Sequence, residues 1–149
     1  MKNVNFYLKS ILISIILTGC VSIDESNDNS DFFTLEGGTF PGEIDVLITS
    51  DTEAAAQYVR DNLDSTVTAC DFDGAAGLTF SSQNNKPPII WLSKAGFDPE
   101  DIAIANHELM HATANTMQYF GVLFSDSSEE AYAYQLQYYS NQFYNKLKQ

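Results

Sequence analysis

The first part of the chain has the apolar and polar pattern of short strands and one helix. Residues 43–49 alternate at first and then become apolar, which indicates a partly buried strand. Apolar residues at helical spacing predict a helix over 52–63, with Asp51 as its N-cap. Runs of β-prone residues predict three further strands, at 67–72, 78–80 and 89–93.

Two longer helices are predicted in the second part of the chain. The first spans about residues 100–120, with Asp98 as its N-cap and Gly121 at its end. Its mostly apolar stripe consists of Ile102, Ala105, Leu109, Ala112, Thr116 and Phe120. The second helix has Ser125 or Asp126 as its N-cap and runs to about Leu147. Together the elements predict an α+β fold, in which a small, mostly antiparallel sheet packs against these helices.

Composition sets limits on the class of protein. The 149 residues are close to the usual size of one domain, and 44% hydrophobic residues are enough for a core, which we expect over 35–149. Acidic residues number 20 against 7 basic ones, which gives a net charge of −13. The basic residues form no patch that would attract a phosphate backbone, so we expect no nucleic-acid partner. An acidic surface also repels anionic lipid, so contact with a membrane requires an anchor.

The N-terminus has the pattern of a secretory signal. Lys2 and Lys9 precede an apolar run over 11–17, which is shorter than the roughly 20 residues that span a bilayer. The residues Leu-Thr-Gly-Cys that end at Cys20 resemble the lipobox of bacterial lipoproteins. The resemblance implies a signal peptide over 1–19 and a lipid on Cys20. The alternatives are ordinary signal cleavage nearby and an uncleaved anchor.

The segment that follows is expected to tether the domain. Residues 20–34 begin with a run rich in Ser, Asn and Asp that cannot bury a core. Lipid on Cys20 would hold the domain at a membrane of the bacterial cell envelope, on the periplasmic side or exposed at the surface. The only other cysteine is Cys70, so an intrachain disulfide is formally possible. With Cys20 acylated, we expect Cys70 to be a buried structural thiol.

One motif carries specific chemistry. Residues 107–111 read His-Glu-Leu-Met-His, in the middle of a predicted helix, and contain both histidines of the chain. Positions i and i+4 share a helix face, so both imidazoles can bind one Zn²⁺. Glu108 lies beside that position, where it could take a proton from a bound water. The alternative is a pair of partly exposed histidines on an amphipathic helix, without a metal.

A catalytic zinc site also needs a third protein ligand and an open position. The chain has no other histidine, and Cys70 is a poor candidate, so the third ligand must be a carboxylate. Glu129 and Glu130, at the start of the last helix, are the candidates.

The motif and the segment after it resemble the gluzincin zinc peptidases. Those proteins combine HExxH with a glutamate from a following helix, often as ExxxD or ExxAD. Glu130 matches that frame, whereas Glu129 does not, and Tyr134 stands where the family has an aspartate that orients a zinc-binding histidine. Tyr134, Asn106 or a backbone carbonyl could supply that contact instead. Residues 89–147 are also similar to small phage- and prophage-type metallopeptidases.

The resemblance implies a minimal zincin-like fold and a zinc ion held by His107, His111 and Glu130. It further implies hydrolysis of a peptide or protein substrate, with Glu108 as general base. Three alternatives remain open. The protein could be a metal-binding or interaction lipoprotein with a degenerate peptidase fold, a structural domain with an accidental motif, or an amidase that acts on cell-wall peptide.

Two substrate contacts follow from the same resemblance. In the family an edge strand precedes the motif helix and binds extended substrate by strand addition, which makes Ile90 and Trp91 in the strand at 89–93 candidates. An ordinary core strand is the alternative there. Tyr134, near Glu130, could stabilise the oxyanion that forms at the substrate carbonyl, with plain packing as the alternative.

Overall fold

The computed structural model describes residues 30–81 and 86–149. Its strands are β1 (Asp31–Leu35), β2 (Ile44–Ile48), β3 (Gly77–Phe80) and β4 (Ile89–Leu92), and its helices are α1 (Thr52–Asn62), the 3₁₀ turn η1 (Ala69–Phe72), α2 (Pro99–Tyr119) and α3 (Glu129–Lys146). The signal peptide and the lipidation of Cys20 lie outside the described residues. No helix within the two described ranges has the length and apolarity needed to cross a membrane.

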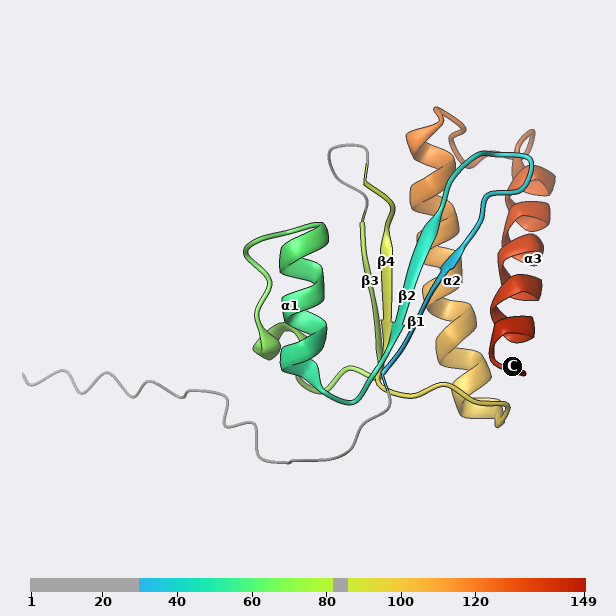
Figure 1. The fold of residues 1–149 in the computed structure, drawn as a ribbon. Coiled ribbons are helices and arrows are strands. Elements are labelled where there is room, and N and C mark those ends of the chain that lie inside the picture. The colour runs from blue at the N-terminus through green and yellow to red at the C-terminus, as the bar shows by residue number, and fades with distance from the viewer. Residues whose placement is uncertain (1–29, 82–85) are drawn as a thin grey trace, which may run out of the picture.

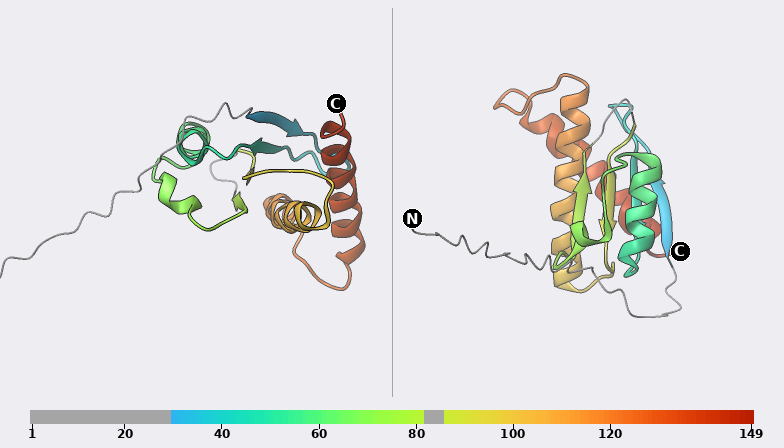
Figure 2. Two further views of the ribbon diagram at one scale, coloured as in Figure 1. Left: turned by 90° about the horizontal axis from the view of Figure 1, so that it is seen from below. Right: turned by 90° about the vertical axis from the view of Figure 1, so that its left-hand side faces the viewer.

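The sheet has the strand order β1-β2-β4-β3. The pairs β1–β2 and β3–β4 are antiparallel, and β2–β4 is parallel, with Val46 opposite Ile90. The predicted α+β class and the mostly antiparallel sheet are therefore confirmed. Helix α1 covers one face, whereas α2 and α3 cover the other as antiparallel neighbours (Figure 1), and Figure 2 shows the same layers from two further sides.

Strand β4 lies inside the sheet, so the expectation that residues 89–93 form a substrate-binding edge is wrong. β2 and β3 pair with it on its two sides, and Ile90 and Trp91 are each only 1% exposed. An uninterrupted apolar run is typical of a strand that is buried on both faces. Trp91 donates its indole N–H to the Thr49 carbonyl at 2.9 Å, which satisfies the one polar group of the side chain.

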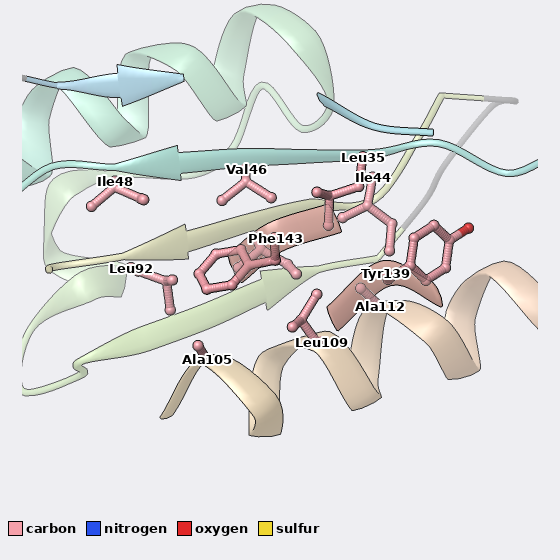
Figure 3. Close-up of a cluster of buried hydrophobic side chains, with 11 residues drawn as sticks. Leu35, Ile44, Val46, Ile48, Leu92, Ala105, Leu109, Ala112, Tyr139 and Phe143 are labelled. Atoms are coloured by element: carbon pink, nitrogen blue, oxygen red, sulfur yellow. The ribbon is translucent and has the colours of Figure 1, made fainter. Parts of the chain in front are cut away.

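Two hydrophobic clusters hold the layers together. Between the sheet and the α2–α3 pair, strand residues such as Val46 and Ile90 pack against Leu109 of α2 and Phe143 of α3 (Figure 3). On the other face, Trp91 and its strand neighbours pack against α1 and η1. Successive strand residues point to opposite faces, so the two inner strands, β2 and β4, contribute to both clusters.

The predicted helix starts are confirmed for α1 and α2. Asp51 accepts hydrogen bonds from the backbone N–H groups of the first turn of α1, at 3.0 Å each. Asp98 does the same for α2, at 3.1 and 2.9 Å, with Pro99 as the first helical residue. Gly121 follows α2 with a φ of 75°, a conformation that glycine adopts without strain.

Three local predictions differ from the structure. Strand β1 begins at Asp31, inside the expected tether. Residues 67–72 contain a 3₁₀ turn in place of a strand, because Asp71 Oδ2 accepts from the Thr68 backbone N–H at 2.7 Å and closes the chain locally. Helix α3 begins at Glu129, because Ser128 Oγ accepts from the Ser125 backbone N–H at 2.9 Å and closes a turn before the helix.

Cys70 also differs from expectation. It lies exposed in η1, where the sequence predicted a buried thiol, and it is disulfide-bonded.

Candidate functional site

Helix α2 brings the two imidazoles together on an exposed face. His107 Nε2 and His111 Nε2 lie 3.1 Å apart, and the ring planes meet at 82°. Two nitrogens that bind one tetrahedral zinc at 2.0–2.1 Å lie about 3.3 Å apart. The pair therefore has the shape of a two-ligand chelate, as the i, i+4 spacing predicts. The same distance also fits one hydrogen bond between neutral rings.

Glu108 lies next to the pair but faces β3. Its side chain is 6% exposed, and Oε2 accepts a hydrogen bond from Thr79 Oγ1 at 2.7 Å. Thr79 thus fixes the orientation of the Glu108 carboxylate. Sequence reasoning missed Thr79 because it lies 29 residues from Glu108. The only feature of the sequence that points to Thr79 is a hydroxyl side chain in a predicted strand.

A glycine lets β3 approach α2 closely enough for this contact. A Cβ on Gly77 would lie 2.9 Å from Glu108 Cγ and 2.9 Å from Ile104 Cγ2. Such a distance is shorter than van der Waals contact, so a side chain at this position would push the strand and the helix apart. Gly77 therefore helps to set the position of the Glu108 side chain.

The motif opens into a pocket along the edge strand. This β3–α2 pocket encloses about 500 Å³ and is lined by Gly77, Leu78, Thr79, Ser81, His107, Glu108, His111, Ala114, Asn115 and Gln118. The two imidazoles, the Glu108 carboxylate and three residues of β3 therefore line one pocket. A strand at the edge of a sheet offers backbone N–H and C=O groups to an incoming extended chain.

The structure does not bring Glu130 to the histidines. Glu130 is exposed at the start of α3 and lines a different pocket, together with Tyr134. In the part of the chain that the structure describes, no group of three His, Cys, Asp or Glu side chains is placed to hold a metal ion. Two of the three zinc ligands implied by the family resemblance are therefore in position, and the third is not.

Glu130 is separated from the histidines because α3 packs against a side of α2 that does not carry them. The Tyr144 hydroxyl of α3 contacts Asn106 Oδ1 at 3.2 Å, so Asn106 marks the side toward α3. At about 100° per residue, His107 and His111 point to a different side of the helix. The Asn106 side chain therefore accepts a hydrogen bond from α3. The hypothesis that Asn106 orients a histidine finds no support in this contact.

Comparisons of the chain with models of protein families, with curated proteins and with solved structures found no match. The candidate site therefore depends on the residues and geometry of this chain.

Proposed function

We propose that this chain is a zinc-dependent hydrolase of peptide bonds, with its centre in the β3–α2 pocket. One observation carries the proposal: an imidazole pair with nitrogens 3.1 Å apart opens into the same pocket as the buried, Thr79-oriented carboxylate of Glu108. A pair of metal ligands beside an oriented base offers two parts of a site for metal-assisted hydrolysis, a place for a Lewis acid and a proton acceptor. Among the described residues β3 is the last strand of the sheet, so its outer side adds a surface for an extended substrate.

The chemistry divides between a bound ion and the residues of the chain. His107 and His111 would hold the zinc, which when bound supplies a Lewis acid at the substrate carbonyl. Glu108 would accept a proton from the attacking water as the new carbon–oxygen bond forms. The carbon–nitrogen bond then breaks, and Glu108 returns that proton to the leaving amine. Thr79 keeps the carboxylate in place through both transfers.

Substrate would bind along β3 in place of β4. The hydrogen-bonding groups of β4 are used by its two neighbours, whereas β3 ends the sheet in the order β1-β2-β4-β3. A peptide added to the outer side of β3 would pass directly over the motif, because β3 and the histidines line one pocket. The residues that would pair with an extended substrate are therefore Leu78 and its neighbours in β3, in place of Ile90 and Trp91.

The decisive experiment measures metal and turnover together. Bound zinc per chain is measured by elemental mass spectrometry in the unmodified protein and in His111→Ala, and peptide cleavage is measured on a mixed peptide library. We expect stoichiometric zinc that is lost in His111→Ala, and cleavage that is lost in Glu108→Gln. Cleavage at an unchanged rate in Glu108→Gln would overturn the assignment of the base.

A metal-binding protein without catalysis is the second candidate. The observation in its favour is the position of Glu130 in a separate pocket, since catalytic zinc sites use three protein ligands. This candidate also predicts zinc that depends on His111, but no peptide cleavage that depends on Glu108. The experiment above separates the two candidates.

We also propose that the domain is anchored to a bacterial envelope membrane through lipid on Cys20. The support is the Leu-Thr-Gly-Cys sequence after a charged start and a short apolar run. Because the chain holds only two cysteines, lipid on the Cys20 thiol and the disulfide that the structure gives Cys70 exclude each other. The mass of the mature chain, compared with that of Cys20→Ser, distinguishes the added lipid from a disulfide.

A further inference from the structure

A second open pocket follows α3 on the side that faces residues 38–40. It encloses about 1100 Å³, and we call it the α3 groove. Its main walls are the segment 38–40 and the α3 residues Glu130, Tyr134, Gln135, Tyr138 and Asn141. None of these residues lines the β3–α2 pocket, so the two sites are separate.

The two walls of the α3 groove are fastened to each other. The Glu36 backbone N–H donates to Gln142 Oε1 at 3.0 Å, and Gln142 Nε2 donates to the Glu36 carbonyl at 2.8 Å. The Tyr139 hydroxyl donates to the Gly42 carbonyl at 2.7 Å. These bonds hold the segment 38–40 at both ends, so the groove is formed before a ligand binds. Ligand binding would then cost little conformational entropy in this segment.

Two tyrosine rings of α3 face this groove and stay uncovered. Tyr134 is 68% exposed and Tyr138 is 43% exposed, although Tyr132 and Tyr139 of the same helix are buried. Positions i and i+4 lie on one face, about 6 Å apart along the axis. The Tyr138 ring packs on the backbone of Gly38, where a Cβ would lie 2.9 Å from Tyr138 Cδ1. Tyr138 is therefore covered on one side by Gly38, whereas most of the Tyr134 side chain is open to solvent.

The polar lining of the groove is mostly amide. Gln135, Gln137 and Asn141 supply side-chain groups that can donate and accept hydrogen bonds. Gln135 is 2% exposed and its side chain lies beside the Tyr139 hydroxyl, so Gln137 and Asn141 are the amides that a ligand would meet first. Glu130 is the only charged side chain among the lining residues.

We propose that the α3 groove binds a neutral carbohydrate. A pyranose ring has apolar C–H faces that stack on exposed aromatic rings, and a rim of hydroxyl groups that pairs with amides. The Glu130 carboxylate and the net charge of −13 disfavour an anionic ligand. Three amide side chains favour a hydroxyl-rich ligand over a proline-rich peptide, which would use the aromatic rings but offers few hydrogen-bond donors. The proposal is independent of zinc and of hydrolysis.

The test uses the full chain in a zwitterionic detergent without sugar groups, so that the detergent does not compete. The probes are cellotetraose and the tetramer of N-acetylglucosamine, with binding measured by calorimetry and by saturation-transfer NMR. We expect at least one probe to bind and Tyr134→Ala to weaken that binding at least tenfold. Tyr119→Ala is the matched control, because Tyr119 is 55% exposed on α2 and is not among the groove residues.

Three results would overturn the proposal. They are no binding of either probe to the unmodified chain, equal binding by Tyr134→Ala, and Tyr134-dependent binding of decaproline in place of both sugars. A second variant, Gln135→Leu, should also weaken sugar binding at least threefold while thermal unfolding shows that it remains folded. If Gln135→Leu does not fold, Asn141→Ala takes its place, since Asn141 is exposed.

Discussion

The β3–α2 pocket and the α3 groove are built in different ways. The pocket takes its chemical groups from one helix and the strand that passes over it, and the paired histidines are four positions apart. The groove joins two segments that are far apart in sequence, as in the hydrogen bond from Tyr139 to Gly42 across 97 residues. The difference explains why the sequence predicted that His107, Glu108 and His111 lie together, but did not predict that Glu130 and Tyr134 line a separate groove.

The largest expected effect that separates the pocket from the groove is on zinc affinity. If the histidine pair carries the site, His111→Ala should weaken zinc binding at least a hundredfold, because a single imidazole is left. Glu130→Gln should change it less than twofold, because Glu130 lines the other pocket. Calorimetric titration with zinc measures both. Equal losses in the two variants would show that Glu130 reaches the ion after all.

The next largest expected effect is on the rate of peptide cleavage. Glu108→Gln should lower kcat/KM for a cleaved peptide more than a hundredfold, because an amide cannot accept the proton, while bound zinc stays the same. Glu129→Gln is the control at the start of α3 and should cleave normally. Loss of zinc in Glu108→Gln would instead indicate that the carboxylate is a ligand.

Gly77 tests the contact between β3 and α2. Gly77→Ala would place a methyl group 2.9 Å from Glu108 Cγ and should lower the free energy of unfolding by about 1–3 kcal/mol. Chemical denaturation measures the loss. Ser81→Ala, near the exposed end of the same strand, should change stability by less than about 0.5 kcal/mol. An unchanged Gly77→Ala variant would show that the strand can move away without cost.

Thr79 should affect catalysis more than binding. Thr79→Val removes the hydroxyl that holds Glu108 at 2.7 Å, so we expect a fivefold to tenfold fall in kcat, about 1 kcal/mol, with KM unchanged. Thr79→Ser keeps the hydroxyl and should restore kcat. A change in KM alone would assign Thr79 to substrate binding.

The bond from Tyr139 that holds the wall of the α3 groove should weaken at high pH. Burial raises the pKa of the Tyr139 hydroxyl above its ordinary value of 10.0. Its contribution to stability is therefore complete below pH 10 and is lost as the pH rises through the higher pKa of the folded state. Tyr139→Phe should cost about 1 kcal/mol at pH 8, from the lost bond to Gly42, and less above pH 10. Urea unfolding at both pH values checks this.

Local rules account for what the sequence predicted correctly. The caps at Asp51 and Asp98, the end of α2 and the run that forms β4 follow from a few neighbouring residues. The proximity of His107 and His111 follows from helix geometry in the same way. Where local side chains offered a competing bond, as Asp71 does to Thr68, the predicted strand did not form.

Packing decides the rest. The contact between Thr79 and Glu108 depends on the position of β3 over α2, which no short pattern encodes. The separation of Glu130 from the histidines depends on the side of α2 that meets α3, which the contact between Asn106 and Tyr144 marks. A pair of ligands within one helix can therefore be predicted from the sequence, but a third ligand from another helix cannot.

The exposure of the two histidine rings has a consequence for metal exchange. Both imidazoles already point to solvent at chelating distance, so an ion could enter or leave without movement of the backbone. Occupancy would then follow the free metal concentration of the surrounding solution and would fall in chelating buffers. The protein would respond to metal supply within its folded state.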